Sequence, residues 1–469
     1  MRKPSFVSSD AVRSLFSQAM SRMYRDEVPQ YGSLLQLVAD VNARVLAQQP
    51  ALAAQLIASG DMDRLDVERH GAIRLGTAEE LATMRRLFAV MGMAPVGYYD
   101  LSVAGVPVHS TAFRPVTDAA LAYNPFRVFT SLLRLELIAD EALRRQATEI
   151  LKRRQIFTAR ALSLIAQCER AGGLTAPEAD EFVREALQTF RWHAEATVDA
   201  PTYDKLQQSH RLVADVVCFK GPHINHLTPR TLDIDAAQAA MPGVGIQAKE
   251  SIEGPPPRRC AILLRQTSFK ALEEKVLFQD GEGQRAGTHT ARFGEIEQRG
   301  AALTQAGRQR YDQLLATVQN TAAQGETAAA YAQRLALVFN AFPDNEDTLR
   351  REGLAFFRYG LTAKGTAWVD AEAADAAPLL DEPLEALIAG GWVCAEPIIY
   401  EDFLPVSAAG IFQSNLGSTA RQHYAVNQDQ AAFEAALGAP FLDEIALYAA
   451  AEARSVEQVR SALRRPVSA

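Results

Sequence analysis

The stretch Gly221–Arg230 gathers two imidazoles, an amide and a guanidinium in a chain that has only eight histidines. Its two prolines disfavour helix, because proline lacks an N–H and pushes the preceding residue toward extended geometry. On an extended strand His226 points to one side while His223 and Asn225 point to the other. We therefore expect one of the two histidines to be a ligand. The alternative is a strand end whose histidines only form hydrogen bonds.

A second histidine lies in the segment Leu65–Gly76, which reads as a strand followed by a helix with a capping box at Thr77–Glu80. On that strand His70 and Arg74 share one face, so a long arginine side chain can lean toward the histidine. The alternative is a half-buried strand histidine beside a surface charge.

Two carboxylates share a face of a third strand. The alternation within Thr288–Gly300 places Glu295 and Glu297 on the same side. Buried carboxylates need a metal ion, a proton or arginine partners. The alternative to a metal is therefore a pair of salt bridges to Arg292 and Arg299.

One histidine from each of two strands and a glutamate from a third would supply two nitrogen ligands and one carboxylate. This is the facial triad that leaves three adjacent positions open on non-haem Fe(II). Two histidines and a glutamate also bind catalytic zinc. The spacing of these residues along the chain does not favour either metal.

The elements expected around these residues indicate an α+β protein. We expect N-terminal packing helices over residues 1–60, a β-rich catalytic core over 61–300 with a helical insertion at about 138–212, and a mainly helical part over 301–469. The apolar run Leu212–Phe219, just before Gly221, reads as a buried strand. A stretch at about 397–412, rich in small residues between aromatics, suits a loop that closes over a ligand. The alternative is a plain turn between strands.

Composition excludes several classes of protein. The net charge of -8 gives no electrostatic basis for binding nucleic acid. The four cysteines lie far apart, which argues against a disulfide framework or a thiolate zinc site. The chain shows neither an apolar leader segment nor a run long enough to cross a membrane, so we expect a soluble cytoplasmic protein.

Four local sequences resemble those of the 2-oxoadipate dioxygenase/decarboxylase family, in the same order and over nearly the whole chain. They are Arg69–Arg74, Gly221–Arg230, Phe293–Gly300 and Tyr400–Ser407. The resemblance implies a fold related to the vicinal oxygen chelate enzymes, in which a curved sheet forms a partial barrel around the metal, here with helical additions. It also implies that Fe(2+) is held by His70, His226 and Glu295.

Carried over by motif, Arg74 and the pair Val406 and Ser407 become substrate contacts, with Arg74 gripping a carboxylate through its planar fork of donors. His223, Asn225 and Glu297 are candidates for orienting the metal ligands.

The implied reaction belongs to lysine catabolism: 2-oxoadipate and O2 give 2-hydroxyglutarate and CO2, without separate 2-oxoglutarate. Two other classes stay open. A zinc-type hydrolase or lyase acting on a dicarboxylate could use the same ligand set. A non-catalytic sensor of a dicarboxylate fits less well, since a binding module has no need for open metal positions.

Overall fold

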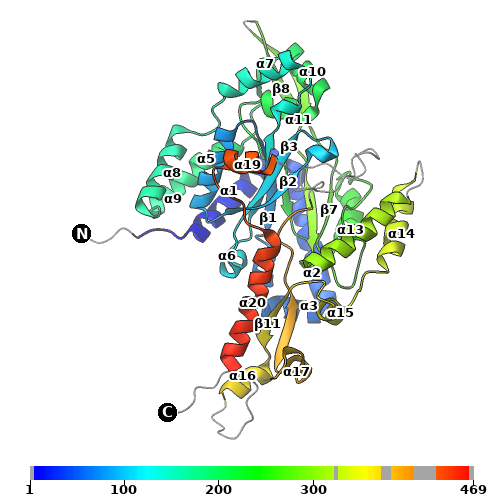
Figure 1. The fold of residues 1–469 in the computed structure, drawn as a ribbon. Helices are drawn as coiled ribbons and strands as arrows, with labels where there is room; N and C mark the ends of the chain where they lie inside the picture. The colour runs from blue at the N-terminus through cyan, green and yellow to red at the C-terminus, as the bar shows by residue number, and fades with distance from the viewer. Residues whose placement is uncertain (1–4, 282, 322–325, 371–381, 405–428, 464–469) are drawn as a thin grey trace. The chain divides into compact units, whose positions relative to one another are not determined.

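The computed structural model describes residues 5–281, 283–321, 326–370, 382–404 and 429–463 (Figure 1). These residues form two compact units, each built from segments that are discontinuous in the chain. Unit 1 comprises Met1–Glu253, Arg265–Gln298 and Asp402–Leu442, and unit 2 comprises Gly254–Leu264, Arg299–Glu401 and Asp443–Ala469. Their boundaries therefore differ from the consecutive ranges expected from the sequence. Mixed helix and sheet confirm the expected α+β class.

The largest sheet lies in unit 1 and has five strands in the order β2-β3-β4-β1-β6. Their bounds are β1 (Arg69–Leu75), β2 (Ala94–Asp100), β3 (Val108–Arg114), β4 (Arg127–Leu133) and β6 (Leu227–Pro229). Strand β1 runs parallel to β4 and antiparallel to β6, with His70 opposite both Arg127 and Thr228. Because β1 has a neighbour on each side, the strand that carries His70 and Arg74 is buried almost throughout.

Strand β1 leads into helix α5 (Ala78–Val90), as the sequence predicts. The Thr77 hydroxyl accepts from the Glu80 N–H at 3.1 Å and caps this helix. The Glu80 carboxylate reaches one residue further back than in a standard capping box and accepts from the N–H of Gly76 at 2.7 Å. Strand, helix and the antiparallel strands β2 to β4 thus form one βαβββ unit.

A second, smaller sheet pairs β7 (Leu264–Ser268) with β10 (Glu295–Arg299). The backbone next to β6 meets β10 directly: Arg230 and Glu297 form a parallel bridge, and the N–H of Thr231 donates to the carbonyl of Glu297 at 2.7 Å. Strands β1, β6, β10 and β7 are therefore successive neighbours. Side chains from all four can reach one place.

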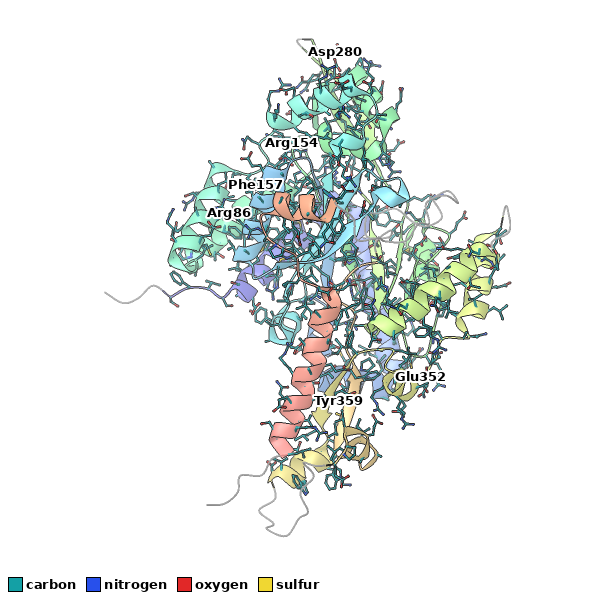
Figure 2. The ribbon with its side chains drawn as sticks, in the orientation of Figure 1. Arg86, Arg154, Phe157, Asp280, Glu352 and Tyr359 are labelled. Carbon is teal, nitrogen blue, oxygen red and sulfur yellow. The ribbon has the colours of Figure 1, made fainter. Side chains whose placement is uncertain are left out.

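A third sheet pairs β5 (Glu195–Asp199) with the hairpin of β8 (Glu273–Asp280) and β9 (Gly283–Thr290). Asp280, labelled in Figure 2, stands at the tip of this hairpin. The hairpin is an insertion between β7 and β10, and its β9 strand returns the chain to the residues just before Glu295.

Helices surround the sheets of unit 1. They are α1 (Ser9–Glu27), α2 (Pro29–Gln48), α3 (Pro50–Ala58), α4 (Asp61–Leu65), α6 (Asp118–Tyr123), α7 (Glu141–Lys152), α8 (Ala159–Ala171), α9 (Ala176–Leu187), α10 (Ala200–Ser209), α11 (Arg211–Val217), α12 (Ile234–Ala240) and α19 (Asp429–Leu437). Tyr24 on α1 donates through its hydroxyl to the carbonyls of Asn225 and Phe293, at 3.0 and 2.6 Å. The N-terminal helices thus brace the backbone beside two predicted site segments.

The strand expected at Leu212–Phe219 is wrong, because residues Arg211–Val217 form helix α11. His210 caps the helix by accepting from the N–H of Leu212 at 3.1 Å. Every residue from Leu212 to Val217 is buried. A short helix buried on all sides shows no polar face, so its sequence cannot be told from that of a buried strand.

Unit 2 combines one antiparallel pair of strands with helices. The strands are β11 (Phe357–Leu361) and β12 (Val393–Pro397), and the helices are α13 (Gln305–Asn320), α14 (Ala328–Phe339), α15 (Glu346–Arg351), α16 (Ala363–Asp370), α17 (Leu384–Ala389) and α20 (Glu444–Leu463). Helix α15 ends at Arg351; Gly353 then adopts a positive φ of 62°, and the chain continues into β11. None of the helices that the structure describes is long and apolar enough to cross a membrane.

Candidate metal centre

Three residues that the sequence singled out meet inside unit 1. His70, His226 and Glu295 are fully buried and place one ligand atom each within 4.8 Å of the others. The Nε2 atom of His70 lies 3.1 Å from Oε1 of Glu295, and Nε2 of His226 lies 3.8 Å from the same oxygen. Ligands about 2.1 Å from one ion lie about 3.0 to 3.5 Å apart, so in this His–His–Glu cluster the first distance matches that of a metal site and the second is slightly wider.

Adjacent strands bring the cluster together. His70 is on β1, His226 directly precedes β6, and Glu295 begins β10. Gly71 permits the close approach of the first two segments: a Cβ at that position would lie 2.6 Å from Ile224 Cδ1 and 3.0 Å from the His226 carbonyl oxygen. Any larger residue beside His70 would push the His226 segment away.

Several polar atoms of the cluster have no hydrogen-bond partner among the described residues. They are both ring nitrogens of His226 and Oε2 of Glu295, all buried. Burial lowers the pKa of His226 to about 4, so the ring is neutral near pH 7 and has a lone pair to offer. Leaving such groups buried and unpaired costs free energy, whereas coordination to a cation would satisfy one nitrogen of His226 and an oxygen of Glu295. The donor set fits a divalent metal.

Each ring nitrogen of His70 lies close to a carboxylate oxygen. Its Nδ1 lies 2.9 Å from Oε2 of Glu297, on the side away from Glu295. Burial favours the neutral ring, but the carboxylates of Glu297 and Glu295 outweigh burial and raise the pKa of His70. A carboxylate behind Nδ1 fixes the tautomer and leaves Nε2 to face the cluster. Glu297 therefore lies where the sequence predicted an orienting residue.

Two further donors hold Glu295. Its Oε1 accepts from the Thr228 hydroxyl at 3.1 Å and from Nε2 of Gln266 at 2.8 Å. These contacts hold the carboxylate through Oε1, the oxygen that also lies nearest to both histidines, whereas Oε2 has no hydrogen-bond partner among the described residues. Gln266, from β7, is a site residue that the sequence analysis missed.

A buried network of charges lies behind Glu297. Arg127 from β4 reaches Glu297 at 3.5 Å and Glu68 at 2.7 Å. Glu68 also contacts Arg230 at 3.1 Å. The alternative to a metal was a pair of salt bridges from the two glutamates to Arg292 and Arg299; of these arginines, Arg292 contacts Glu27 and Glu274. The network ties the orienting carboxylate to strand β4 and to the residues that flank β1 and β6.

Arg74 lies on the same strand as His70, and its Nη1 donates to Oδ2 of Asp215 at 2.7 Å. Asp215 is on helix α11, within the run whose conformation was predicted wrongly, and its role was missed for that reason. His223 Nε2 lies 3.3 Å from Oδ1 of Asp215, and Asn225 Nδ2 lies 3.2 Å from the same His223 nitrogen. The structure thus places His223 and Asn225 beside Asp215.

Aromatic rings wall the cluster. Phe403 meets the ring of His70 edge-on at 5.0 Å between centroids, and Phe293 packs at 4.8 Å from His226. Such walls keep bulk water from the metal ligands and strengthen electrostatic interactions inside the site. Phe403 comes from the stretch predicted as an active-site loop. Val406 and Ser407, from the same stretch, lie outside the described residues.

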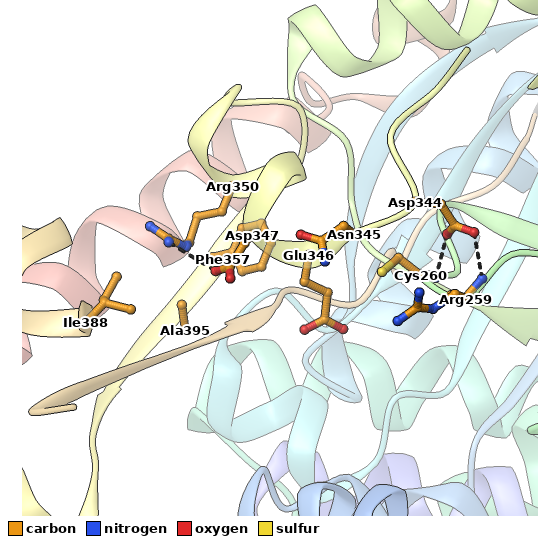
Figure 3. Close-up of a pocket in the computed structure, with 10 residues that line it drawn as sticks. All are labelled: Arg259, Cys260, Asp344, Asn345, Glu346, Asp347, Arg350, Phe357, Ile388 and Ala395. Carbon is orange, nitrogen blue, oxygen red and sulfur yellow. Dashed lines mark hydrogen bonds and ion pairs between the residues drawn. The ribbon is translucent and has the colours of Figure 1, made fainter. Parts of the chain in front are cut away.

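Unit 2 contains a separate pocket of about 410 Å³, drawn in Figure 3. Several of its polar groups are paired: the Asp344 carboxylate accepts from the N–H groups of Arg259 and Cys260 at 3.1 and 2.8 Å, and Arg350 contacts Asp347 at 3.3 Å. The residues of this lining include no histidine. Among the described residues, the His–His–Glu cluster is the group with the geometry of a metal site.

Comparisons with known proteins agree with this chemistry. A sequence profile of the 2-oxoadipate dioxygenase/decarboxylase family matches residues 16–415. The 2-oxoadipate dioxygenase/decarboxylase of Pseudomonas putida is 61% identical over 462 residues, covering 98% of both chains, and that of Escherichia coli K12 is 60% identical over 449 residues, covering 96% of this chain and 98% of the other. The crystal structure of the Pseudomonas putida hydroxyglutarate synthase in complex with 2-oxoadipate superposes with a TM-score of 0.90 at 58% identity, over 99% of this chain and all of that one (100%). The chain belongs to the 2-oxoadipate dioxygenase/decarboxylase family.

Proposed function

We propose that this protein is an Fe(II)-dependent dioxygenase that converts 2-oxoadipate and O2 to 2-hydroxyglutarate and CO2. The observation that carries the proposal is the buried His–His–Glu cluster, with its unpaired nitrogens on His226 and unpaired oxygen on Glu295. Family membership supports the substrate, since relatives that share about three fifths of the sequence bear the name of this activity. The equation balances: the carbon of 2-oxoadipate is recovered in 2-hydroxyglutarate and CO2.

His70, His226 and Glu295 would hold the iron, a ligand set that leaves adjacent positions open. Bound iron supplies Lewis acidity, a template for the 2-oxo acid and redox chemistry with O2. Glu297 holds His70 through Nδ1, while Thr228 and Gln266 hold one oxygen of Glu295. These contacts fix the ligand geometry before substrate arrives.

Arg74 would bind a carboxylate of the substrate. A guanidinium has five N–H donors in a planar fork, which matches a carboxylate in a bidentate manner. Arg74 is buried and shares a strand face with His70, two positions along the same side of β1. Val406 and Ser407 remain proposed as further substrate contacts.

We also propose that the sheets of unit 1 form one curved sheet around the metal, as in the vicinal oxygen chelate enzymes. Two features support this fold. The first is the βαβββ unit of β1, α5, β2, β3 and β4, whose strand β1 pairs with β6 in the sheet order β2-β3-β4-β1-β6. The second is the bridge from Arg230 to Glu297, which continues the strand order through β10 to β7.

Anaerobic purification followed by metal analysis and assays of O2 uptake tests the proposal. With iron bound, 2-oxoadipate should cause O2 uptake and CO2 release in equal amounts, with 2-hydroxyglutarate as product and no need for added 2-oxoglutarate. Chelation should abolish turnover, and Fe(II) should restore it. Equal turnover under strict anaerobiosis would point instead to a zinc-type hydrolase or lyase. Iron-loaded protein without any turnover would point to a sensor.

A further inference from the structure

We propose that Asp215 is a positioning residue for the reaction: it holds the Arg74 guanidinium in the orientation that receives a substrate carboxylate. The inference rests on the proposed function, because it takes Arg74 as the substrate contact. Among the described residues, Asp215 contacts Arg74, His289 and His223 and none of the three cluster residues. It would act through Arg74.

The two oxygens of Asp215 have separate partners. Oδ2 accepts from Arg74 Nη1 at 2.7 Å, whereas Oδ1 accepts from His289 Nε2 at 2.9 Å and lies 3.3 Å from His223 Nε2. A carboxylate with both oxygens engaged cannot rotate without breaking a contact. Asp215 therefore offers Arg74 a fixed acceptor.

A chain of donors sets the orientation of Asp215. The Tyr203 hydroxyl lies 2.8 Å from Nδ1 of His289. Burial raises the pKa of Tyr203 to about 12, so the hydroxyl stays protonated and donates to that nitrogen. His289 can then donate from Nε2 to Asp215. The histidine ring is also packed against Phe219, with centroids 4.6 Å apart.

Charge keeps Asp215 ionised despite its burial. Burial alone would raise the pKa of its carboxyl, but the neighbouring His223, His289 and Arg74 side chains hold the pKa well below its usual range. An ionised carboxylate makes a charge-assisted hydrogen bond to a guanidinium, roughly twice as strong as a neutral one. The Arg74 side chain thus has an anchor at one nitrogen, and its remaining donors are oriented before substrate binds.

Two of the residues that fix Asp215 come from parts of unit 1 that supply no member of the cluster. Tyr203 lies on helix α10, in the helical insertion, and His289 lies on β9 of the inserted hairpin, while Asp215 itself is on the following helix α11. The helical insertion and the inserted hairpin therefore both supply residues that fix Asp215, the acceptor for Arg74. The two insertions therefore serve substrate binding through Arg74, whereas β1, the segment before β6 and β10 supply the metal ligands.

A double-mutant cycle tests this role. The variants are Arg74→Ala, Asp215→Asn and the double variant, compared with the parent for kcat/KM and KM with 2-oxoadipate and for the anaerobic dissociation constant of 2-oxoadipate. Asp215→Asn alone should lower kcat/KM roughly tenfold or more. In the Arg74→Ala background the same change should lower kcat/KM less than about twofold, because residues that act as one unit are not additive. Iron content should stay at the parent level in all four proteins.

Asp235→Asn is the matched control, since Asp235 pairs with another buried arginine of unit 1, Arg265, at 3.0 Å. Its effect should be the same with and without Arg74. Tyr203→Phe is a milder variant that keeps the ion pair; it should lower kcat/KM only when Arg74 is present, which guards against misfolding of Asp215→Asn. Full additivity of Asp215→Asn and Arg74→Ala would overturn the inference.

Failure of the inference and failure of the proposed function give different results. If 2-oxoadipate is turned over and the effects of the two substitutions on kcat/KM are additive, the inference about Asp215 is wrong and the proposed function stands. If the parent shows no O2 uptake, the proposed reaction is wrong. If the effects of the two substitutions on the dissociation constant of 2-oxoadipate are still coupled, Asp215 remains the residue that positions Arg74.

Discussion

His70 and Glu297 lie side by side within the buried strands β1 and β10, with Nδ1 of the imidazole 2.9 Å from a carboxylate oxygen. The contact occupies the ring nitrogen that faces away from Glu295 and His226. Because a metal-binding histidine needs one nitrogen for the ion and one for an orienting partner, Glu297 selects which nitrogen of His70 is presented. The two glutamates thus have different roles: Glu295 belongs to the cluster, and Glu297 lies behind His70.

The first prediction concerns that contact. Glu297→Gln should lower metal affinity roughly 10- to 100-fold, as loss of an orienting partner does in other metal sites. The measurement is competition for Fe(II) with a chelator of known affinity. Glu274→Gln is the control, because Glu274 pairs with Arg292 at 2.8 Å outside the cluster. Equal metal affinity in the parent and in Glu297→Gln would show that Glu297 does not orient His70.

The second prediction concerns the cluster itself. Replacing His70 or His226 by alanine, or Glu295 by glutamine, should each remove bound iron and O2 uptake. His109→Gln should retain both, because His109 packs against Phe433 at 4.6 Å, on a different strand from the cluster. Metal analysis of the purified variants gives the readout. A fully active Glu295→Gln protein would transfer the carboxylate role to Glu297.

Local sequence narrowed the candidates for this site, and the resemblance to the family then singled out His70, His226 and Glu295. Alternation along a strand placed His70 with Arg74, and Glu295 with Glu297, before any pairing between strands was known. Because a strand has a strict period of two residues, the members of each pair could be assigned to the same face of their strand. The cap at Thr77 likewise located the end of β1 and the start of α5 from four adjacent residues.

Partners from distant parts of the chain could not be predicted in this way. Gln266 reaches Glu295 only because β7 pairs with β10, and Arg127 reaches Glu297 only because β4 pairs with β1. Asp215 was hidden for another reason: its helix is buried on every side, so the helical period does not show. Pairings between segments that are not neighbours in the chain are decided by the packed fold.

The third prediction concerns the support that α1 gives to the site. Tyr24→Phe should lower the free energy of unfolding by about 1 to 3 kcal/mol, because the carbonyls of Asn225 and Phe293 lose a buried donor. Tyr31→Phe is a matched control: Tyr31 is equally buried, packs on Tyr24 at 5.1 Å, and its hydroxyl has a weaker 3.4 Å contact to Ser21. Unfolding of the metal-free proteins should show the larger loss for Tyr24. Equal losses would mean that the two carbonyls do not need this donor.

The last prediction concerns Arg74 as the carboxylate contact. Arg74→Lys should lose substantial activity, since an ammonium cannot reproduce the planar fork, and Arg74→Ala should lose nearly all of it. Iron content should stay near that of the parent, because the cluster is untouched; Arg265→Lys serves as the control at another buried arginine. If Arg74 holds the distal carboxylate, the alanine variant should also lose its preference for 2-oxoadipate over a monocarboxylic 2-oxo acid of similar length. Unchanged turnover and preference would assign the carboxylate to another cation. Arg230 and Arg292 would then be the next to test, although Arg230 already contacts Glu68 and Arg292 contacts Glu27.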